Sequence, residues 1–252
     1  MISREQLLGY LDELLKPSQI KDYCPNGLQV EGVGEIKKIV TGVTASQALI
    51  DAAITANADA LLVHHGYFWK GESQVITSLK RKRIKALLDA GINLIAYHLP
   101  LDIHPELGNN AQLAKRFSID NMRGLEPGNP VSVAVRGELS QPQTVAQLTK
   151  TIEQQLGREP LVEGASDKII SSIAWCSGGG QSFIELAGEH GIDAFISGEV
   201  SEQTIHLARE YDIAFYAAGH HATERYGAKA LGEHLAQALG LEVEFIDIDN
   251  PA

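Results

Sequence analysis

Two adjacent histidines, His64 and His65, follow a short apolar run and are followed at once by Gly66. The run predicts a buried strand of a parallel sheet, and such sheets bind ligands at the carboxyl ends of their strands. Within a continuing strand the two rings would point to opposite faces, but a glycine at the strand end lets the backbone bend and turn both toward one crevice. These imidazoles are therefore the first candidates for metal binding or catalysis.

A histidine with a carboxylate four residues later ends two further predicted strands. These pairs are His98 with Asp102 and His220 with Glu224. Pro100 argues against a regular helix within the first pair, so we expect a turn that brings Asp102 back beside His98. In both pairs we expect the imidazole and the carboxylate to lie side by side at the end of a strand.

Charge balance indicates what such a cluster could hold. Four neutral imidazoles and two carboxylates in one place leave two repelling negative charges, which protonated histidines or cations must offset. Two divalent ions with a bridging hydroxide satisfy this arrangement. Nitrogen and oxygen ligands without thiolate favour zinc, iron, manganese or nickel over magnesium or copper(I).

Weaker candidates precede the second pair in the chain. Glu199 and Glu202 follow a predicted strand and could orient a metal ligand or act as a general base. The loop at Gly178, Gly179 and Gly180 stands between a predicted strand and helix, where backbone N–H groups can bind an anion. It lacks the lysine of a P-loop, and tight packing is the competing interpretation.

A repeated strand–helix–strand pattern positions these residues. The segment from Ile39 aligns without a gap with the segment from Ile173, and Asp59 then matches Asp193. Each segment is typical of a βαβ unit. The alignment predicts an internal duplication, with two related α/β lobes whose mainly parallel sheets are flanked by helices.

The stretch "RGLEPGNP" marks the predicted boundary between the lobes, because it is rich in glycine and proline. The first lobe, residues 1–125, would carry the double histidine and the first histidine–carboxylate pair. The second lobe, residues 126–252, would carry the other pair. If all of these side chains bind the same metals, the site lies in the cleft between the lobes.

Composition and charge restrict the class of protein. The chain has 252 residues, of which 44% are hydrophobic, and a formal net charge of −11, which argues against extended nucleic-acid or anionic-membrane binding. No segment has the pattern of a signal peptide or a membrane span, so a cytoplasmic location is expected. The two cysteines predict neither a disulfide framework nor a thiolate zinc site.

Six segments together resemble one known family. They are "NGLQVEG", "HHGYFWKG", "HLPLD", "GGGQSF", "SGEVSEQTIH" and "GHHATE". In combination they are similar to the NIF-three-like family, whose members are commonly named GTP cyclohydrolase 1 type 2 homologues, over essentially the whole chain. The resemblance implies two related α/β lobes, a dinuclear metal site between them and a ring-shaped homohexamer.

The resemblance also implies roles for particular residues. Carried over motif by motif, the metal ligands are His64, His65, Asp102, His220 and Glu224. His98 matches a position at the site and is either an additional ligand or a residue that orients one. Many members have a tyrosine where this chain has His221, which leaves open which of the two neighbours binds metal, and the tyrosine pattern favours His220.

The implied activity is that of a dimetal-dependent hydrolase. A metal-activated hydroxide would attack a nucleotide or a similar small substrate. Two alternatives stay open: a dimetal phosphoesterase, and a metal-handling or scaffold protein that stores or delivers ions without turnover. Release of formate rather than phosphate from a nucleotide panel separates the two enzymes.

Overall fold

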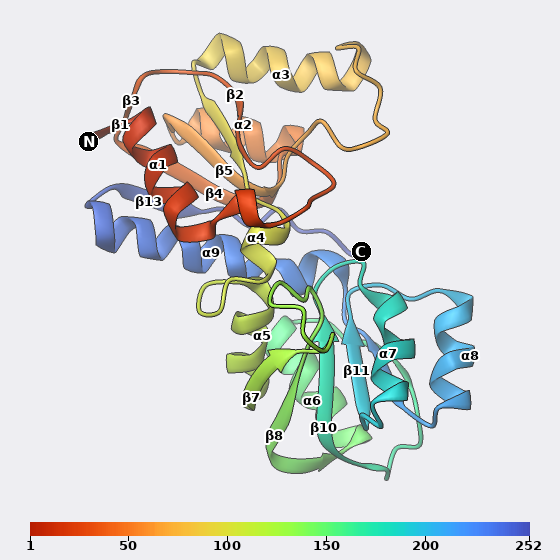
Figure 1. The fold of residues 1–252 in the computed structure, drawn as a ribbon. Coiled ribbons are helices and arrows are strands. Elements are labelled where there is room, and N and C mark those ends of the chain that lie inside the picture. The colour runs from red at the N-terminus through yellow and green to blue at the C-terminus, as the bar shows by residue number, and fades with distance from the viewer. The chain divides into compact units, whose positions relative to one another are not determined.

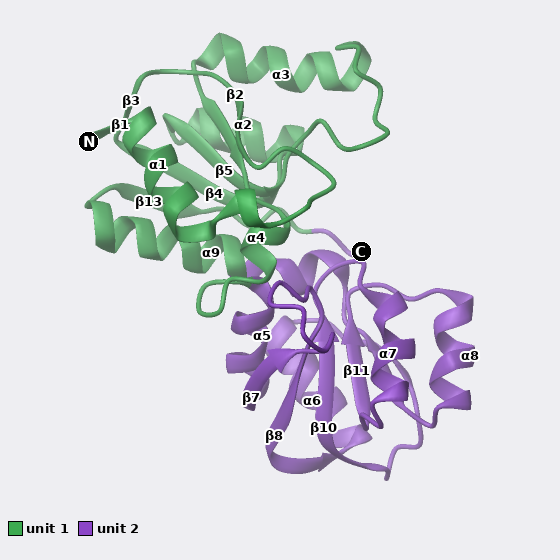
Figure 2. Cartoon of the chain, in the orientation of Figure 1, with its two compact units in different colours: residues 1–108, 227–249 green, residues 109–226, 250–252 purple.

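The computed structural model describes residues 1–252 and shows a mixed α/β protein (Figure 1). The chain forms two compact units (Figure 2). Unit 1 comprises residues 1–108 and 227–249, and unit 2 comprises residues 109–226 and 250–252. None of the helices combines the length and the apolar character that crossing a bilayer requires.

The main sheet of unit 1 has five strands in the order β13, β4, β5, β6, β2. Their bounds are Glu242–Phe245, Lys38–Thr44, Ala60–His65, Asn93–Ala96 and Gly27–Val30. Only β2 pairs antiparallel with its neighbour, β6. A separate two-stranded sheet joins β1 (Ile2–Ser3) to β3 (Glu35–Ile36). Parallel pairing thus dominates unit 1, as the βαβ pattern predicts.

Two apolar clusters cover the two faces of this sheet. Leu61 packs in the cluster that contains helices α2 and α3, while its neighbour Leu62 packs in the cluster that contains α1 and the later part of α9. This alternation follows from the pleat of a strand buried on both faces. The helices of unit 1 are α1 (Arg4–Leu15), η1 (Pro17–Gln19), α2 (Gln47–Thr55), α3 (Ser78–Ala90) and α4 (Leu99–Asp102).

The sheet of unit 2 has six strands in the order β7, β8, β10, β11, β12, β9. Their bounds are Ile119–Gly124, Val135–Thr144, Ile169–Cys176, Ala194–Ser197, Ala214–Ala217 and Leu161–Glu163. Only β10, β11 and β12 are parallel to one another, and the other pairs are antiparallel. The expectation of a mainly parallel sheet is therefore wrong for this unit, because its outer strands return antiparallel to the βαβ core.

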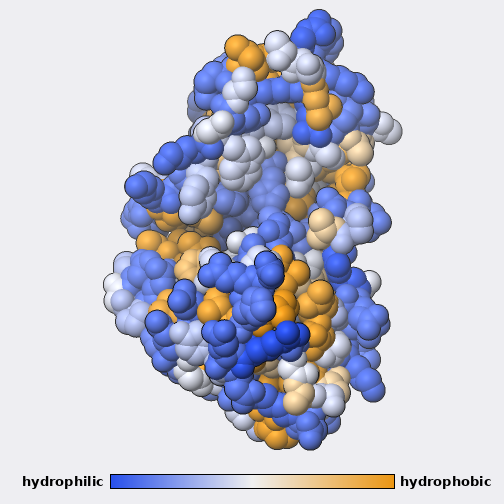
Figure 3. Space-filling view, turned by 90° about the vertical axis from the view of Figure 1, so that its right-hand side faces the viewer, coloured by the Kyte–Doolittle hydropathy of each residue, from blue (hydrophilic) through white to orange (hydrophobic).

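Helices cover both faces of the second sheet as well. They are α5 (Asn109–Phe117), α6 (Val145–Leu156), η2 (Gln181–Phe183), α7 (Ile184–Glu189) and α8 (Glu202–Glu210). Helix α9 (His220–Leu239) begins in this unit, and its later part belongs to unit 1. The face seen in Figure 3 is mostly polar, with apolar patches between the polar residues.

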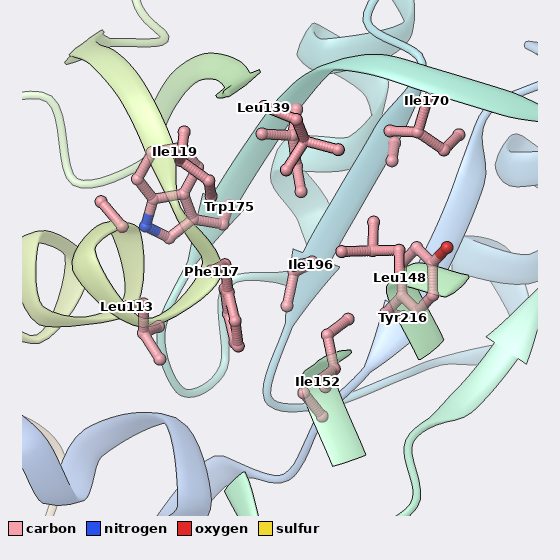
Figure 4. Packing of buried hydrophobic residues seen from close by; sticks show 14 of the residues in the cluster. Leu113, Phe117, Ile119, Leu139, Leu148, Ile152, Ile170, Trp175, Ile196 and Tyr216 are labelled. Atoms are coloured by element: carbon pink, nitrogen blue, oxygen red, sulfur yellow. The ribbon is translucent and has the colours of Figure 1, made fainter. Parts of the chain in front are cut away.

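The largest buried side chain of unit 2, Trp175, packs among aliphatic residues of α5 and the strands (Figure 4). Its indole Nε1 donates a hydrogen bond to the carbonyl oxygen of Asn110 at 3.0 Å, so the polar atom of this ring is satisfied within the core. Trp175 lies one residue before the end of β10, and its burial fixes the strand that leads into the glycine-rich loop.

The units do not follow the expected division at residue 125. Strand β13, near the C-terminus, pairs in parallel with β4, and Leu231 and Leu235 of α9 pack in a core cluster of unit 1. Unit 1 is therefore built from two separate segments of the chain, residues 1–108 and 227–249.

The two βαβ segments share one structural detail. Asp59 accepts hydrogen bonds from the backbone N–H groups of Lys37 and Lys38, at 2.7 and 2.9 Å. Asp193 accepts them from Ser171 and Ser172, at 3.0 and 2.8 Å. These donors occupy matching positions in the gapless alignment. An internal duplication stays a prediction, and this match supports it.

Candidate metal centre

The double histidine lies at the end of β5. His64 is fully buried, and its Nδ1 lies 3.1 Å from the carbonyl oxygen of Tyr97. Because a carbonyl only accepts, Nδ1 carries the hydrogen in the neutral ring and Nε2 carries the lone pair. That Nε2 lies 3.4 Å from Oδ1 of Asp102, which is 4% exposed. Two acceptors facing each other in a buried place favour a bound cation or a proton between them.

His65 is half-buried and lies against the neighbouring strand. Its Nδ1 is 3.2 Å from Oγ1 of Thr44, the residue that pairs with it across β4 and β5. The turn that follows is held by Gln29, whose Oε1 accepts the backbone N–H of Tyr67 at 2.6 Å. A Cβ on Gly66 would lie 2.1 Å from that oxygen. Glycine is required here by this close approach, and the backbone φ of Gly66 is not in the left-handed region.

His98 stands immediately before helix α4 and is held by the loop at residues 20–26. Its Nδ1 lies 2.7 Å from Oδ1 of Asp22, and its backbone N–H donates to Oδ1 of Asn26 at 2.8 Å. The other oxygen of Asp22 accepts the N–H of Leu99 at 2.9 Å. Burial alone would raise the pKa of Asp22, but the hydrogen bond and charge of His98 outweigh it and hold the pKa below its usual value. Asp22 is thus a carboxylate that orients His98.

Asp102 ends α4, a single helical turn whose Pro100 stands near its start, where proline is tolerated. A single helical turn therefore stands where a non-helical turn was expected, because proline at the start of a helix removes no intrahelical hydrogen bond, and its contacts also differ from the expectation. Asp102 contacts His64, and the carboxylate on Nδ1 of His98 comes from Asp22. The pairing is exchanged because the loop at 20–26 closes on His98, which sequence spacing does not reveal.

These elements bring three imidazoles together within unit 1. The ring centroids of His64 and His65 are 4.6 Å apart, those of His64 and His98 are 5.0 Å apart, and those of His65 and His98 are 5.7 Å apart. One nitrogen from each ring lies within 4.8 Å of the others, so the group could hold a metal ion. Asp102 adds a carboxylate to the set through its contact with His64.

The second pair lies at the start of helix α9. His220 and Glu224 are one turn apart, and Nε2 of His220 lies 3.2 Å from Oε2 of Glu224. The other nitrogen, Nδ1, lies 2.7 Å from Oε1 of Glu199. Burial lowers the pKa of His220, but hydrogen bonds and charges from Glu224 and Glu199 outweigh it and raise the pKa to about 9. Between these two carboxylates the imidazole is a cation at neutral pH.

The glycine-rich loop packs against this pair. Gly178 has φ +61°, and a Cβ there would lie 2.0 Å from Oε1 of Glu224. Its backbone N–H donates to Oγ1 of Thr223 at 3.0 Å. A Cβ on Gly180 would lie 2.3 Å from Sγ of Cys176, whereas at Gly179 the nearest atom is 3.5 Å away. Tight packing therefore explains why Gly178 and Gly180 are glycines. Neither tight packing nor anion binding requires a glycine at position 179.

Two other candidates are Glu202 and His221. Glu202 is the first residue of α8, and its side chain is 94% exposed and lies 3.9 Å from Nε2 of His206. His221 is 8% exposed, and its backbone N–H donates to the carbonyl oxygen of Ala252 at 3.1 Å. Of the two acidic candidates Glu199 and Glu202, the structure therefore brings Glu199 to His220.

The family model for Duf34/NIF3 (NGG1p interacting factor 3) matches residues 2–251. The chain belongs to the Duf34/NIF3 family. A relative from Vibrio cholerae is 60% identical over 248 residues, covering 98% of each chain, and one from Escherichia coli K12 is 57% identical with the same coverage. Both are named GTP cyclohydrolase 1 type 2 homolog. A solved structure described as protein ybgI of unknown function covers 100% of both chains at 54% identity, with a TM-score of 0.94.

Membership of the Duf34/NIF3 family confirms the resemblance drawn from the sequence. Neither the word "homolog" nor "unknown function" establishes an activity for these relatives. The chemistry must therefore be inferred from the donor atoms. Imidazole nitrogens with their Nδ1 atoms held by oxygen, beside buried carboxylates, suit zinc, iron(II), manganese or nickel.

Sequence reasoning missed the residues that orient the donors. Asp22 and Asn26 hold His98, Gln29 holds the turn after the double histidine, and Thr44 contacts His65. Asn26 and Gln29 both lie in the segment "NGLQVEG", which the family resemblance already contains. That motif therefore marks positions whose function is to hold the histidines in place.

Proposed function

We propose that this chain is a metal-dependent hydrolase that holds two divalent ions. The proposed ligands are His64, His65, Asp102, His220 and Glu224, with His98 as a further ligand. The observation that carries the proposal is the group of three imidazoles in unit 1, with two Nδ1 atoms held by oxygen acceptors and one Nε2 facing a buried carboxylate. That the ligands of both units meet in one cleft stays a prediction.

Bound divalent ions would lower the pKa of a water molecule to about 7 and polarise an oxygen of the substrate. The protein's own contribution is to prepare the ligand atoms. Tyr97 and Asp22 fix the Nδ1–H groups of His64 and His98, which leaves Nε2 as the donor atom in each ring. Fixing the tautomer in this way also raises the basicity of the ligand nitrogen.

Glu199 has the corresponding task in unit 2. It accepts from Nδ1 of His220, so the proton that a metal must displace is the one on Nε2, which faces Glu224. Glu199 also remains as a proton acceptor 2.7 Å from Nδ1 and is the group through which His220 can pass a proton. Glu202, which is exposed, has no such contact.

The proposed substrate is a nucleotide or a similar small molecule: one water would open the imidazole ring of a purine to a formamide, and a second would hydrolyse this amide and release formate. The names of the relatives support this choice. The test uses protein reconstituted with manganese or zinc and a panel of nucleoside triphosphates, with formate and phosphate measured separately. Formate supports a cyclohydrolase, phosphate alone supports a dimetal phosphoesterase, and His64→Ala serves as the control for a contaminating enzyme.

A metal-handling protein without turnover is the second candidate. It is favoured by the exposure of His220, whose side chain is 29% accessible, because an ion bound there could be exchanged with another protein. If metal-loaded protein releases neither formate nor phosphate but transfers its ions within minutes to a chelating acceptor, the hydrolase proposal fails and this candidate stands.

Self-association into a homohexamer is also proposed, and it rests on the family resemblance. Light scattering of the purified chain at micromolar concentration should give a particle of six chains. A monomer under these conditions would contradict this assembly without affecting the ligand assignment.

A further inference from the structure

An exposed aromatic ring stands beside the histidines of unit 1 without a packing role. Tyr23 is 62% exposed, and its hydroxyl makes no hydrogen bond within the chain. Its one ring contact is with His98, at 6.5 Å between centroids and an interplanar angle of 64°. The two rings meet closer to edge-on than stacked. The contact with His98 therefore does not depend on parallel stacking of the tyrosine ring.

The backbone of Tyr23 is nevertheless fixed on both sides. Its N–H donates to Oδ1 of Asp22 at 2.6 Å, and its carbonyl oxygen accepts the N–H of Lys70 at 2.6 Å. The second bond ties the loop at residues 20–26 to the loop that follows the double histidine. An aromatic ring held in solvent on an ordered backbone loses little conformational entropy when a ligand covers it.

A second aromatic residue flanks the same histidines. The ring of Trp69 lies 4.9 Å from that of His98, at 82°, and 5.8 Å from that of His65, at 59°. Its indole Nε1 donates to the carbonyl oxygen of Gly66 at 3.2 Å, and its backbone N–H donates to Oε2 of Glu72 at 3.1 Å. The ring of Trp69 is thus held by its own hydrogen bond, and the ring of Tyr23 stands on a fixed backbone, both beside His98.

We propose that Tyr23 and Trp69 form a subsite that binds a flat heteroaromatic ring by stacking, next to His98. Stacking on an aromatic side chain tolerates any flat ring, so the subsite would recognise planarity rather than a particular pattern of hydrogen bonds. The adjacent Lys70 is exposed and makes no ion pair within the chain, so a ligand that also carries an anionic group is favoured. The inference rests on the proposed function only for the place of the subsite beside the ligands.

The test measures binding and needs no turnover. Titration calorimetry with manganese-loaded full-length protein would compare adenosine 5′-monophosphate with ribose 5-phosphate, which keeps the anion and lacks the ring. The first should bind about tenfold more tightly, in keeping with the usual strength of one aromatic stack. Equal affinity of the two probes, or no binding of the nucleotide at millimolar concentration, would overturn the proposal.

Three variants assign the preference to the tyrosine. Tyr23→Phe keeps the ring and should keep the tenfold ratio, whereas Tyr23→Leu keeps apolar area without a flat face and should reduce the ratio to near one. Metal content should be unchanged in both, because the side chain has no role in the core. Leu79→Ala, at an exposed apolar residue outside the subsite, controls for general surface effects. A ratio that survives in Tyr23→Leu would overturn the assignment.

The outcome is separable from that of the hydrolase proposal. A protein that prefers the flat probe but turns over no substrate would refute the hydrolase and keep the subsite. Turnover without any preference for the flat probe would refute the subsite and keep the hydrolase.

Discussion

The two units hold a histidine in the same way, by a carboxylate on its Nδ1, but they combine their carboxylates with different numbers of imidazoles. In unit 1 the Nδ1 of His98 lies 2.7 Å from Asp22, and in unit 2 the Nδ1 of His220 lies 2.7 Å from Glu199. Unit 1 combines three imidazoles with two carboxylates, Asp22 and Asp102, whereas unit 2 places a single imidazole between two carboxylates. The first set is rich in nitrogen donors, and the second is an ion pair in which one imidazole stands between two acids.

This difference follows from what stands at the strand ends. The gapless alignment places His64 over Gly198 and His65 over Glu199. A Cβ on Gly198 would lie 2.7 Å from Cα of His220, so the start of α9 leaves no room for a side chain at this position. Unit 2 therefore supplies its histidine from a helix, and the strand end supplies the carboxylate that orients it.

The largest effect is expected from Gly178→Ala, which would break the unit 2 set. A Cβ would meet Glu224 at 2.0 Å, and φ +61° is strained for alanine. We expect a loss of about 1–3 kcal/mol in the free energy of unfolding and loss of most bound metal, measured by urea titration and elemental analysis. Gly179→Ala, where the nearest atom is 3.5 Å away, is the matched control and should change neither quantity. Equal behaviour of the two variants would contradict the role given to this loop.

The next effect concerns the unit 1 set. Asp22→Asn keeps the shape of the side chain but weakens the acceptor on His98, so metal affinity should fall by about 10–100-fold. Competition with a fluorescent chelator measures this change. Asp51→Asn is the control, because this exposed carboxylate accepts a hydrogen bond from Gln47 of its own helix and lies outside both donor sets. An unchanged affinity in Asp22→Asn would show that His98 is not part of the metal site.

A smaller effect should appear with pH in the metal-free protein. A pKa of about 9 for His220, above its ordinary 6.5, means that its ion pair stabilises the fold fully below pH 6.5 and that this stabilisation is lost as pH rises through 9. The difference in unfolding temperature between the chelated protein and His220→Gln should therefore shrink by about 2–4 °C over this range. Metal affinity should instead rise as the pH rises through this range, because a metal ion must displace the Nε2 proton of His220. A constant difference in unfolding temperature would contradict the ion pair.

The smallest effect separates the two acidic candidates of unit 2. Glu199→Gln should weaken metal binding a few-fold, because His220 loses the charged acceptor on Nδ1. Glu202→Gln should change nothing, since that side chain is 94% exposed. Calorimetric titration with manganese measures both. If Glu202→Gln weakened metal binding and Glu199→Gln did not, the roles given to these two residues would have to be exchanged.

Local patterns in the sequence predict the parts of the fold that depend on local chain geometry. The apolar run before His64 predicts β5, and the matching segments predict a βαβ unit in each half, both of which the structure contains. The double histidine lies at the end of its strand as expected. These features follow from side-chain periodicity and from glycine at strand ends.

The remaining features depend on contacts between distant parts of the chain. Asp22 reaches His98 because two loops close on each other, and β13 pairs with β4 after the chain has passed through unit 2. No periodicity within either segment encodes these approaches. For the same reason the division into units and the exchange of carboxylate partners between Asp102 and Asp22 could not be predicted from spacing.

Metal stoichiometry tests the central proposal, that both donor sets are needed to hold the ions. Elemental analysis of protein reconstituted with zinc or manganese should give two ions per chain, as a dinuclear hydrolase requires. His64→Ala and Glu224→Gln, one from each set, should each fall below one ion per chain while remaining folded by circular dichroism. A wild-type value near zero, or a value near two in either variant, would contradict the account.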